Sequence, residues 1–142
     1  MKLNQSQKGL AIVEAAIILP VFLLLMFGIM EFGIVLYEKA VIRNANREAA
    51  RSGIALRSPK LTKADIEGVA IRYCQTNLIG YKAANLTVTA TQSAPPDFGT
   101  QLRVDIVYRY NNMVLGSLLG LFPGNPFPNP LPLPATTTMN NE

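Results

Sequence analysis

The chain has 142 residues, no histidine and a single cysteine, Cys74. The absence of histidine removes the commonest general base and the commonest zinc ligand in proteins. A lone cysteine cannot form an intrachain disulfide bond, so Cys74 is expected to be either a semi-buried helix residue or half of an intermolecular disulfide.

Residue combinations typical of enzymes are also missing. There is no Ser-His-Asp or Cys-His set, no phosphate-binding loop and no cluster of metal ligands, and no spacing pairs the carboxylates. The net charge is +4, and the basic residues are spread too thinly for a nucleic-acid site. The sequence predicts a non-enzymatic protein without metal, cofactor, small-molecule substrate or nucleic-acid partner.

A long apolar run near the N-terminus is the main feature that is present. It follows a short polar segment, residues 1–9, whose side-chain charges are Lys2 and Lys8, and residues 10–30 carry one charge, Glu14. At ~1.5 Å per residue this run covers ~30 Å, enough to cross a bilayer. A cleaved signal peptide is the alternative, but the run is too long and no A-x-A-like site follows it. We therefore predict a retained transmembrane helix over residues 10–31.

The charges in and beside this span point to one candidate functional residue, while the orientation follows from the lengths and polarity of the flanking segments. An ionised carboxyl inside a membrane helix costs ~2.5–3.5 kcal/mol on insertion scales. Glu14 is therefore either an acid at the headgroup level or an assembly residue, and Glu31 is interpreted as a solvated acid at the outer boundary. The short tail and the polar remainder favour a cytoplasmic N-terminus and an extracytoplasmic C-terminal domain.

The helix is predicted to leave the membrane and to continue as a stalk, residues 32–57. Pro20 is tolerated inside the span with a kink, and the first stop signals are Ser52-Gly53 and Ser58-Pro59. Four basic residues recur at four-residue spacing, which forms a stripe that is either solvated or paired with acids of a neighbouring subunit. This basic stripe consists of Lys39, Arg43, Arg47 and Arg51, and the apolar side of the stalk consists of Val41, Ile42, Ala45, Ala49 and Ala50.

Residues 58–142 predict a small α+β domain. A second helix is expected over 63–78, with Thr62 as N-cap and Asp65 in a capping box. Alternating polarity over 86–91 and 102–110 predicts an antiparallel hairpin with one face on the core, and 135–139 could add a third strand. In the second strand, Leu102, Val104 and Ile106 should face the core, and Arg103 and Asp105 should face water.

Two further segments of the domain are distinctive in composition. Residues 113–122 are apolar but too short to span a membrane, so buried packing and membrane or partner contact both stay open. Residues 123–134 contain six prolines and predict a rigid, extended connector.

Several N-terminal motifs occur together in this chain. They are Lys8-Gly9-Leu10-Ala11-Ile12-Val13-Glu14, Ile18-Leu19-Pro20, Phe27-Gly28-Ile29-Met30-Glu31-Phe32-Gly33 and Asn44-Ala45-Asn46-Arg47-Glu48-Ala49-Ala50-Arg51, with a weaker echo at Ala135-Thr136-Thr137-Thr138-Met139. This pattern resembles the TadE-like pseudopilins, small pilin-related proteins of tight-adherence (Flp-type) pilus machines. One departure is Ala15, where members of the family tend to carry an aromatic residue.

The resemblance implies a pilin-like fold and cleavage after Gly9 by a prepilin peptidase. Leu10 would then supply the new N-terminal amine, and Glu14 would be the fifth residue of the mature chain, able to pair with that amine on a neighbouring subunit. It also implies a place in the inner membrane or pilus, a role in pilus assembly, secretion or cell adhesion, and other pilin-like subunits and pilus assembly proteins as partners. The alternative is an uncleaved single-pass membrane adaptor with a small extracytoplasmic binding domain.

Overall fold

The computed structural model describes residues 5–56, 58–92, 98–111, 116, 124 and 129–141. Its elements follow the order α1 (Gln5–Ile54), α2 (Lys63–Asn77), the short 3-10 helix η1 (Ala83–Asn85), β1 (Leu86–Gln92), β2 (Gln101–Tyr110) and β3 (Leu131–Asn140). The predicted α+β class, with a long first helix, a second helix and a small antiparallel sheet, is confirmed. Most of the apolar segment 113–122 and part of the connector 123–134 lie outside the described residues.

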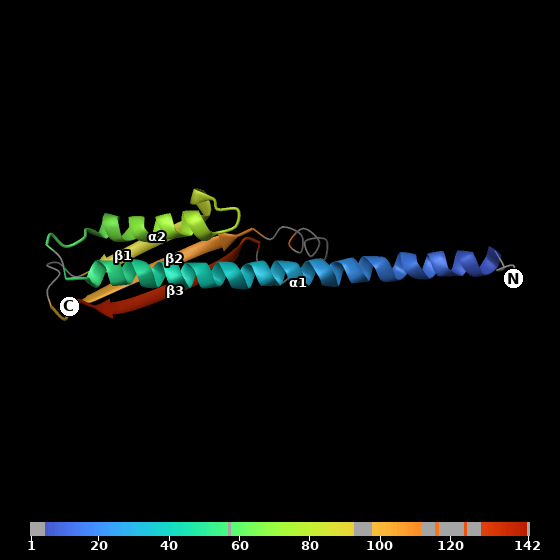
Figure 1. The fold of residues 1–142 in the computed structure, drawn as a ribbon, viewed down its shortest axis with the longest axis horizontal. Coiled ribbons are helices and arrows are strands. Elements are labelled where there is room, and N and C mark those ends of the chain that lie inside the picture. Colours follow the sequence, from blue (N-terminus) through green and yellow to red (C-terminus); the bar gives the residue numbers. More distant parts are fainter. Residues whose placement is uncertain are drawn as a thin grey trace.

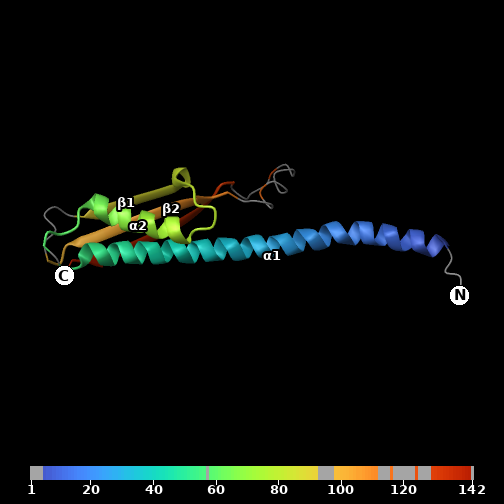
Figure 2. The same cartoon turned by 45° about the horizontal axis from the view of Figure 1, so that its top comes forward.

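Helix α1 is 50 residues long and runs unbroken through Pro20. Figure 1 shows that α2 and the sheet flank one half of it, while the half towards the N-terminus projects alone, and Figure 2 shows a gentle curve in that projecting half. The large apolar side chains from Leu10 to Met30 are all exposed. Among the described residues, α1 is the one helix long and apolar enough to cross a membrane.

The sheet has the order β1-β2-β3, and both pairs of strands are antiparallel. Both helices lie on the same face of this sheet (Figures 1 and 2), α1 against β2 and β3 and α2 against β1. The alternation predicted for β2 is confirmed, because Leu102, Val104 and Ile106 are buried and Arg103 is exposed. The core between helices and sheet is made mainly of Ile42, Ala45 and Ala49 from α1, Ile66, Ala70 and Cys74 from α2, and Leu102, Val104 and Ile106 from β2.

Helix α2 begins with the predicted capping box. The Thr62 hydroxyl accepts a hydrogen bond from the Asp65 amide at 3.2 Å, and the Asp65 carboxylate accepts one from the Thr62 amide at 3.0 Å. These two bonds satisfy amides that the first helical turn would leave unpaired, which fixes the start of the helix.

The first predicted stop signal of α1 is confirmed, because the helix ends at Ile54, one residue after Gly53. Gly53 also lets the helix approach Leu102 and Ile66 closely. One boundary differs from the sequence-based expectation. Strand β3 begins at Leu131, inside the connector expected over 123–134, so Pro132 and Pro134 belong to the sheet. Prolines are tolerated there because β3 is an edge strand, where a missing amide need not break the ladder.

Candidate functional site

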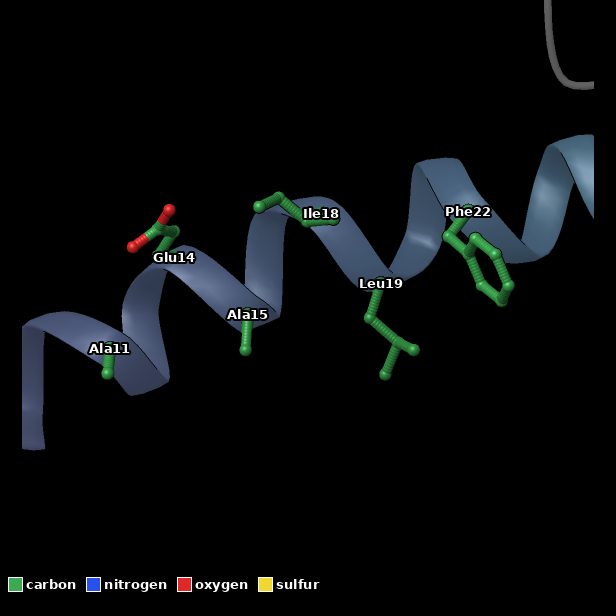
Figure 3. A pocket seen from close by; sticks show the side chains of 6 residues that line it. All are labelled: Ala11, Glu14, Ala15, Ile18, Leu19 and Phe22. Atoms are coloured by element: carbon green, nitrogen blue, oxygen red, sulfur yellow. The ribbon is translucent and has the colours of Figure 1, made fainter.

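The projecting half of α1 carries Glu14 on an otherwise apolar surface. The carboxyl group points away from the helix, and the residues around it line a shallow hollow (Figure 3). These residues are Ala11, Ala15, Ile18, Leu19 and Phe22. The Glu14 carboxylate makes no hydrogen bond or ion pair with any described residue. An exposed acid without a side-chain partner, near the start of an apolar surface long enough to span a membrane, gains strongly from a partner charge supplied from outside the chain.

Gly9 and Leu10 lie one turn before Glu14 on the same helix. A Cβ atom at Gly9 would meet no other atom within 4 Å, and Leu10 is 71% exposed. Folding of this chain therefore does not require a glycine at position 9. Both Gly9 and Leu10 are exposed on the surface of α1.

The basic stripe lies at the other end of α1, beside the sheet. Arg43, Arg47 and Arg51 are exposed, and Lys39 is partly buried. Arg43 and Arg47 line a groove of about 470 Å³ against residues 134–137 of β3. None of the four makes an ion pair with a described residue, so the stripe is an unneutralised surface beside the edge of the sheet. The structure does not bring this stripe near Glu14, because roughly 40 Å of helix separates Arg43 from Glu14 at ~1.5 Å per residue.

A buried carboxyl that the sequence analysis did not single out lies between α1 and β2. Glu38 is fully buried, and neither of its carboxyl oxygens has a hydrogen-bond partner. Burial raises the pKa of Glu38 to about 7. The Tyr110 hydroxyl is also buried without a partner, and burial, followed by the charges of Glu31 and Glu38, raises its pKa to about 12.

The burial of Glu38 could have been predicted from its position on the apolar side of the stalk. It lies four residues before Ile42, and Ala45 and Ala49 continue the same helical face. The same face carries Asn46, which is buried with both amide atoms unpartnered. An acid spaced in register with the core residues of a helix is expected to be buried, once it is known which face of the helix packs against the domain.

The structure corrects one other interpretation from the sequence and decides between two alternatives for Cys74. Glu31 is not a solvated boundary acid, because it is only 6% exposed. Cys74 is fully buried in α2, and burial raises the pKa of its thiol to about 11. A protonated, inaccessible thiol cannot form an intermolecular disulfide while the domain is folded, so the simpler reading as a core residue holds. In the described part of the chain, no three acidic or cysteine side chains lie close enough to hold a metal ion.

Comparison with protein families finds a match for the N-terminal part of the sequence. Residues 9–51 match the family model described as TadE-like protein, which confirms the resemblance predicted from the N-terminal motifs. The matched segment begins at Gly9, contains Glu14 and ends at the last arginine of the basic stripe. The TadE-like family is associated with Tad pili and has an N-terminal apolar helix, so a membrane and pilus-related role is supported. No curated protein and no solved structure matched the chain.

Proposed function

We propose that this protein is a membrane-anchored pseudopilin or minor pilin that is cleaved after Gly9 and takes part in assembling a tight-adherence pilus or a related secretion system. Residues 1–9 form the cytoplasmic leader, 10–31 the transmembrane helix, 32–57 the stalk and 58–142 the extracytoplasmic domain. The protein resides in the inner membrane, where a prepilin peptidase and other pilin-like subunits act on it or bind it.

The observation that carries this proposal is the isolation of Glu14. The half of α1 that holds it is free of the folded domain, and the surface around it is apolar. Cleavage after Gly9 would create a charged amine on Leu10, one helical turn from Glu14. Subunits that pack through this part of α1 would bury both charges. A carboxylate and an amine from two neighbouring helices each lose solvation in lipid, so they favour each other strongly. Their pairing would also fix the axial register between helices, as a buried polar residue does in a coiled coil.

Replacing Glu14 by glutamine tests this role. Glu14→Gln removes the charge and keeps the size, so insertion should become easier, and the domain should remain folded because Glu14 lies on the projecting half of α1, where the neighbouring large side chains are exposed. We expect the variant to accumulate in the membrane and to be cleaved normally, yet to lose co-purification with pilin-like subunits and pilus formation. The matched control is Glu48→Gln, which removes an exposed acid of the stalk and should leave assembly unchanged. Pilus formation at the wild-type level in Glu14→Gln would contradict the pairing.

A further inference from the structure

The three-stranded sheet has two edge strands, β1 and β3, which differ in whether their outward backbone groups are already occupied. On the β1 edge, the backbone amide of Ala90 donates a hydrogen bond to a Glu67 carboxylate oxygen at 2.9 Å. Helix α2 thereby occupies an amide that points away from β2. Capping of this kind is one way in which proteins prevent an edge strand from pairing with another chain.

Only the first half of the β3 edge lacks outward amide hydrogens. Pro132 and Pro134 have no amide hydrogen, so in a strand paired with β2 they occupy positions whose backbone groups face away from β2. Backbone groups in a strand alternate in direction, so Thr136, Thr138 and Asn140 face the same open side. The hydrogen bond from the Ala90 amide to Glu67 supports this assignment. Val104 lies between Ala90 of β1 and Thr137 of β3. Because the Ala90 amide points away from Val104, the backbone groups of Val104 point towards Thr137, so Thr137 faces β2 and its neighbours Thr136 and Thr138 face away.

The open half of β3 lies beside the basic stripe. Within the described ranges, no residue of another element hydrogen-bonds to the outward backbone groups of Thr136 and Thr138. Arg43 and Arg47 line the adjoining groove together with Thr136 and Thr137, and they carry unneutralised charge. The open edge of β3 and the guanidinium groups of Arg43 and Arg47 thus lie next to each other. Both can form hydrogen bonds with a further segment.

We propose that residues 136–140 of β3 are a docking site for an extended, acid-bearing segment of a partner protein, which adds a fourth strand to the sheet. Backbone hydrogen bonds to Thr136, Thr138 and Asn140 provide affinity, as in other cases of strand addition, and a carboxylate in the groove pairs with Arg43 and Arg47. A second copy of this chain fits less well, because its other edge strand, Leu86–Gln92, contains no acid. The inference rests on the proposed assembly role, since it names how a partner subunit would bind.

Site-directed photo-cross-linking in cells that build the pilus tests the docking site. A benzoylphenylalanine replaces Asn140, which is exposed at the end of β3, and in a control it replaces Thr89, which is exposed on β1.

Two sets of variants should weaken the docking. Thr138→Pro removes an outward amide of the kind that Pro132 and Pro134 also lack, and Thr138→Val is its matched control because it keeps that amide. Arg43→Glu combined with Arg47→Glu changes the groove without touching β3, and Lys63→Glu is the control for charge.

We expect a cross-link from position 140 to an acid-containing extended segment of another protein. Its yield should fall by about tenfold in Thr138→Pro and in the double arginine variant, as expected for the loss of a hydrogen bond or a charge pair, and should persist in Thr138→Val and Lys63→Glu. A cross-link that maps to β1 of a second copy, or a yield that no variant changes, would overturn the proposal. If Glu14→Gln abolishes assembly while the edge variants assemble normally, the docking site fails and the proposed function stands.

Discussion

The Glu38 carboxyl group and the Tyr110 hydroxyl are both buried between α1 and β2, and neither has a hydrogen-bond partner. Besides burial, the titratable groups that raise the pKa of Tyr110 and of its neighbour Tyr108 are acids, phenols and a thiol, and the groups on other elements are Glu31 and Glu38 on α1, Cys74 on α2 and Tyr81 after α2. Strand β3 contributes no titratable side chain. Protonated Glu38 is therefore tolerated at this contact, whereas ionised Glu38 finds no compensating cation among the described residues.

Stability of the domain should fall as pH rises from about 4.5 to about 7. The pKa of Glu38 is raised from 4.5 to about 7 in the folded chain, so between these values the folded state binds more protons than the unfolded state. Stability is then fully present below the unfolded pKa and is lost as pH rises through the folded one, by ~2–3 kcal/mol. Thermal melting of the full chain in detergent, followed by tyrosine circular dichroism, measures this slope.

Glu38→Gln should flatten that slope, since an amide does not titrate in this range. Glu48→Gln, which changes an exposed acid on the same helix, should retain the wild-type slope. An identical pH dependence in wild type and Glu38→Gln would show that Glu38 is not the group responsible.

Gly53 and Gly68 should respond to alanine in opposite directions. A Cβ at Gly53 would lie 2.5 Å from a Leu102 methyl carbon and 2.7 Å from an Ile66 methyl carbon, and both of these side chains are fully buried. Gly53→Ala should therefore destabilise the domain by ~1–3 kcal/mol through overpacking. A Cβ at Gly68 in α2 would meet nothing within 4 Å, so Gly68→Ala should stabilise by up to ~1 kcal/mol through helix propensity. Chemical denaturation of both variants checks the sign, and equal effects would refute the close approach.

Ile106 and Arg103 provide a test of the sheet's two faces. Ile106 is fully buried, so Ile106→Asp places an unpartnered charge in the core and should cost several kcal/mol, enough to unfold a small domain. Arg103 is exposed on the other face and pairs with Asp105 at 2.8 Å. Arg103→Asp removes that solvated pair and should cause only a small loss, because exposed ion pairs contribute little. The two melting temperatures should differ widely, and similar ones would contradict the assigned alternation.

The elements that could be predicted from the sequence are those with local causes. Thr62 and Asp65 form their capping box within one turn, and the alternation in β2 reflects a sheet with a single buried face. The family motif likewise lies in one continuous segment, 9–51.

What could not be predicted depends on packing between distant segments. The burial of Glu38 follows from where β2 and α2 meet the stalk, and the same contact makes Gly53 a point of close approach as well as a residue at the helix end. The extension of β3 back to Leu131 was hidden because prolines usually argue against a strand, and only its edge position permits them. Glu14 is a different case: the sequence motif that contains it was evident, but the partner that we propose for it belongs to another subunit.

Processing at Gly9 is the central claim, because the pairing of Glu14 requires a free amine on Leu10. Intact mass measurement of the protein extracted from membranes, in cells with an active prepilin peptidase, tests it directly. The account predicts a mature chain that begins at Leu10, and a Gly9→Val variant that keeps the full-length mass while α1 still folds, because a side chain at position 9 meets no neighbour. A wild-type protein that still begins at Met1 in those cells would contradict the account and would favour an uncleaved membrane adaptor.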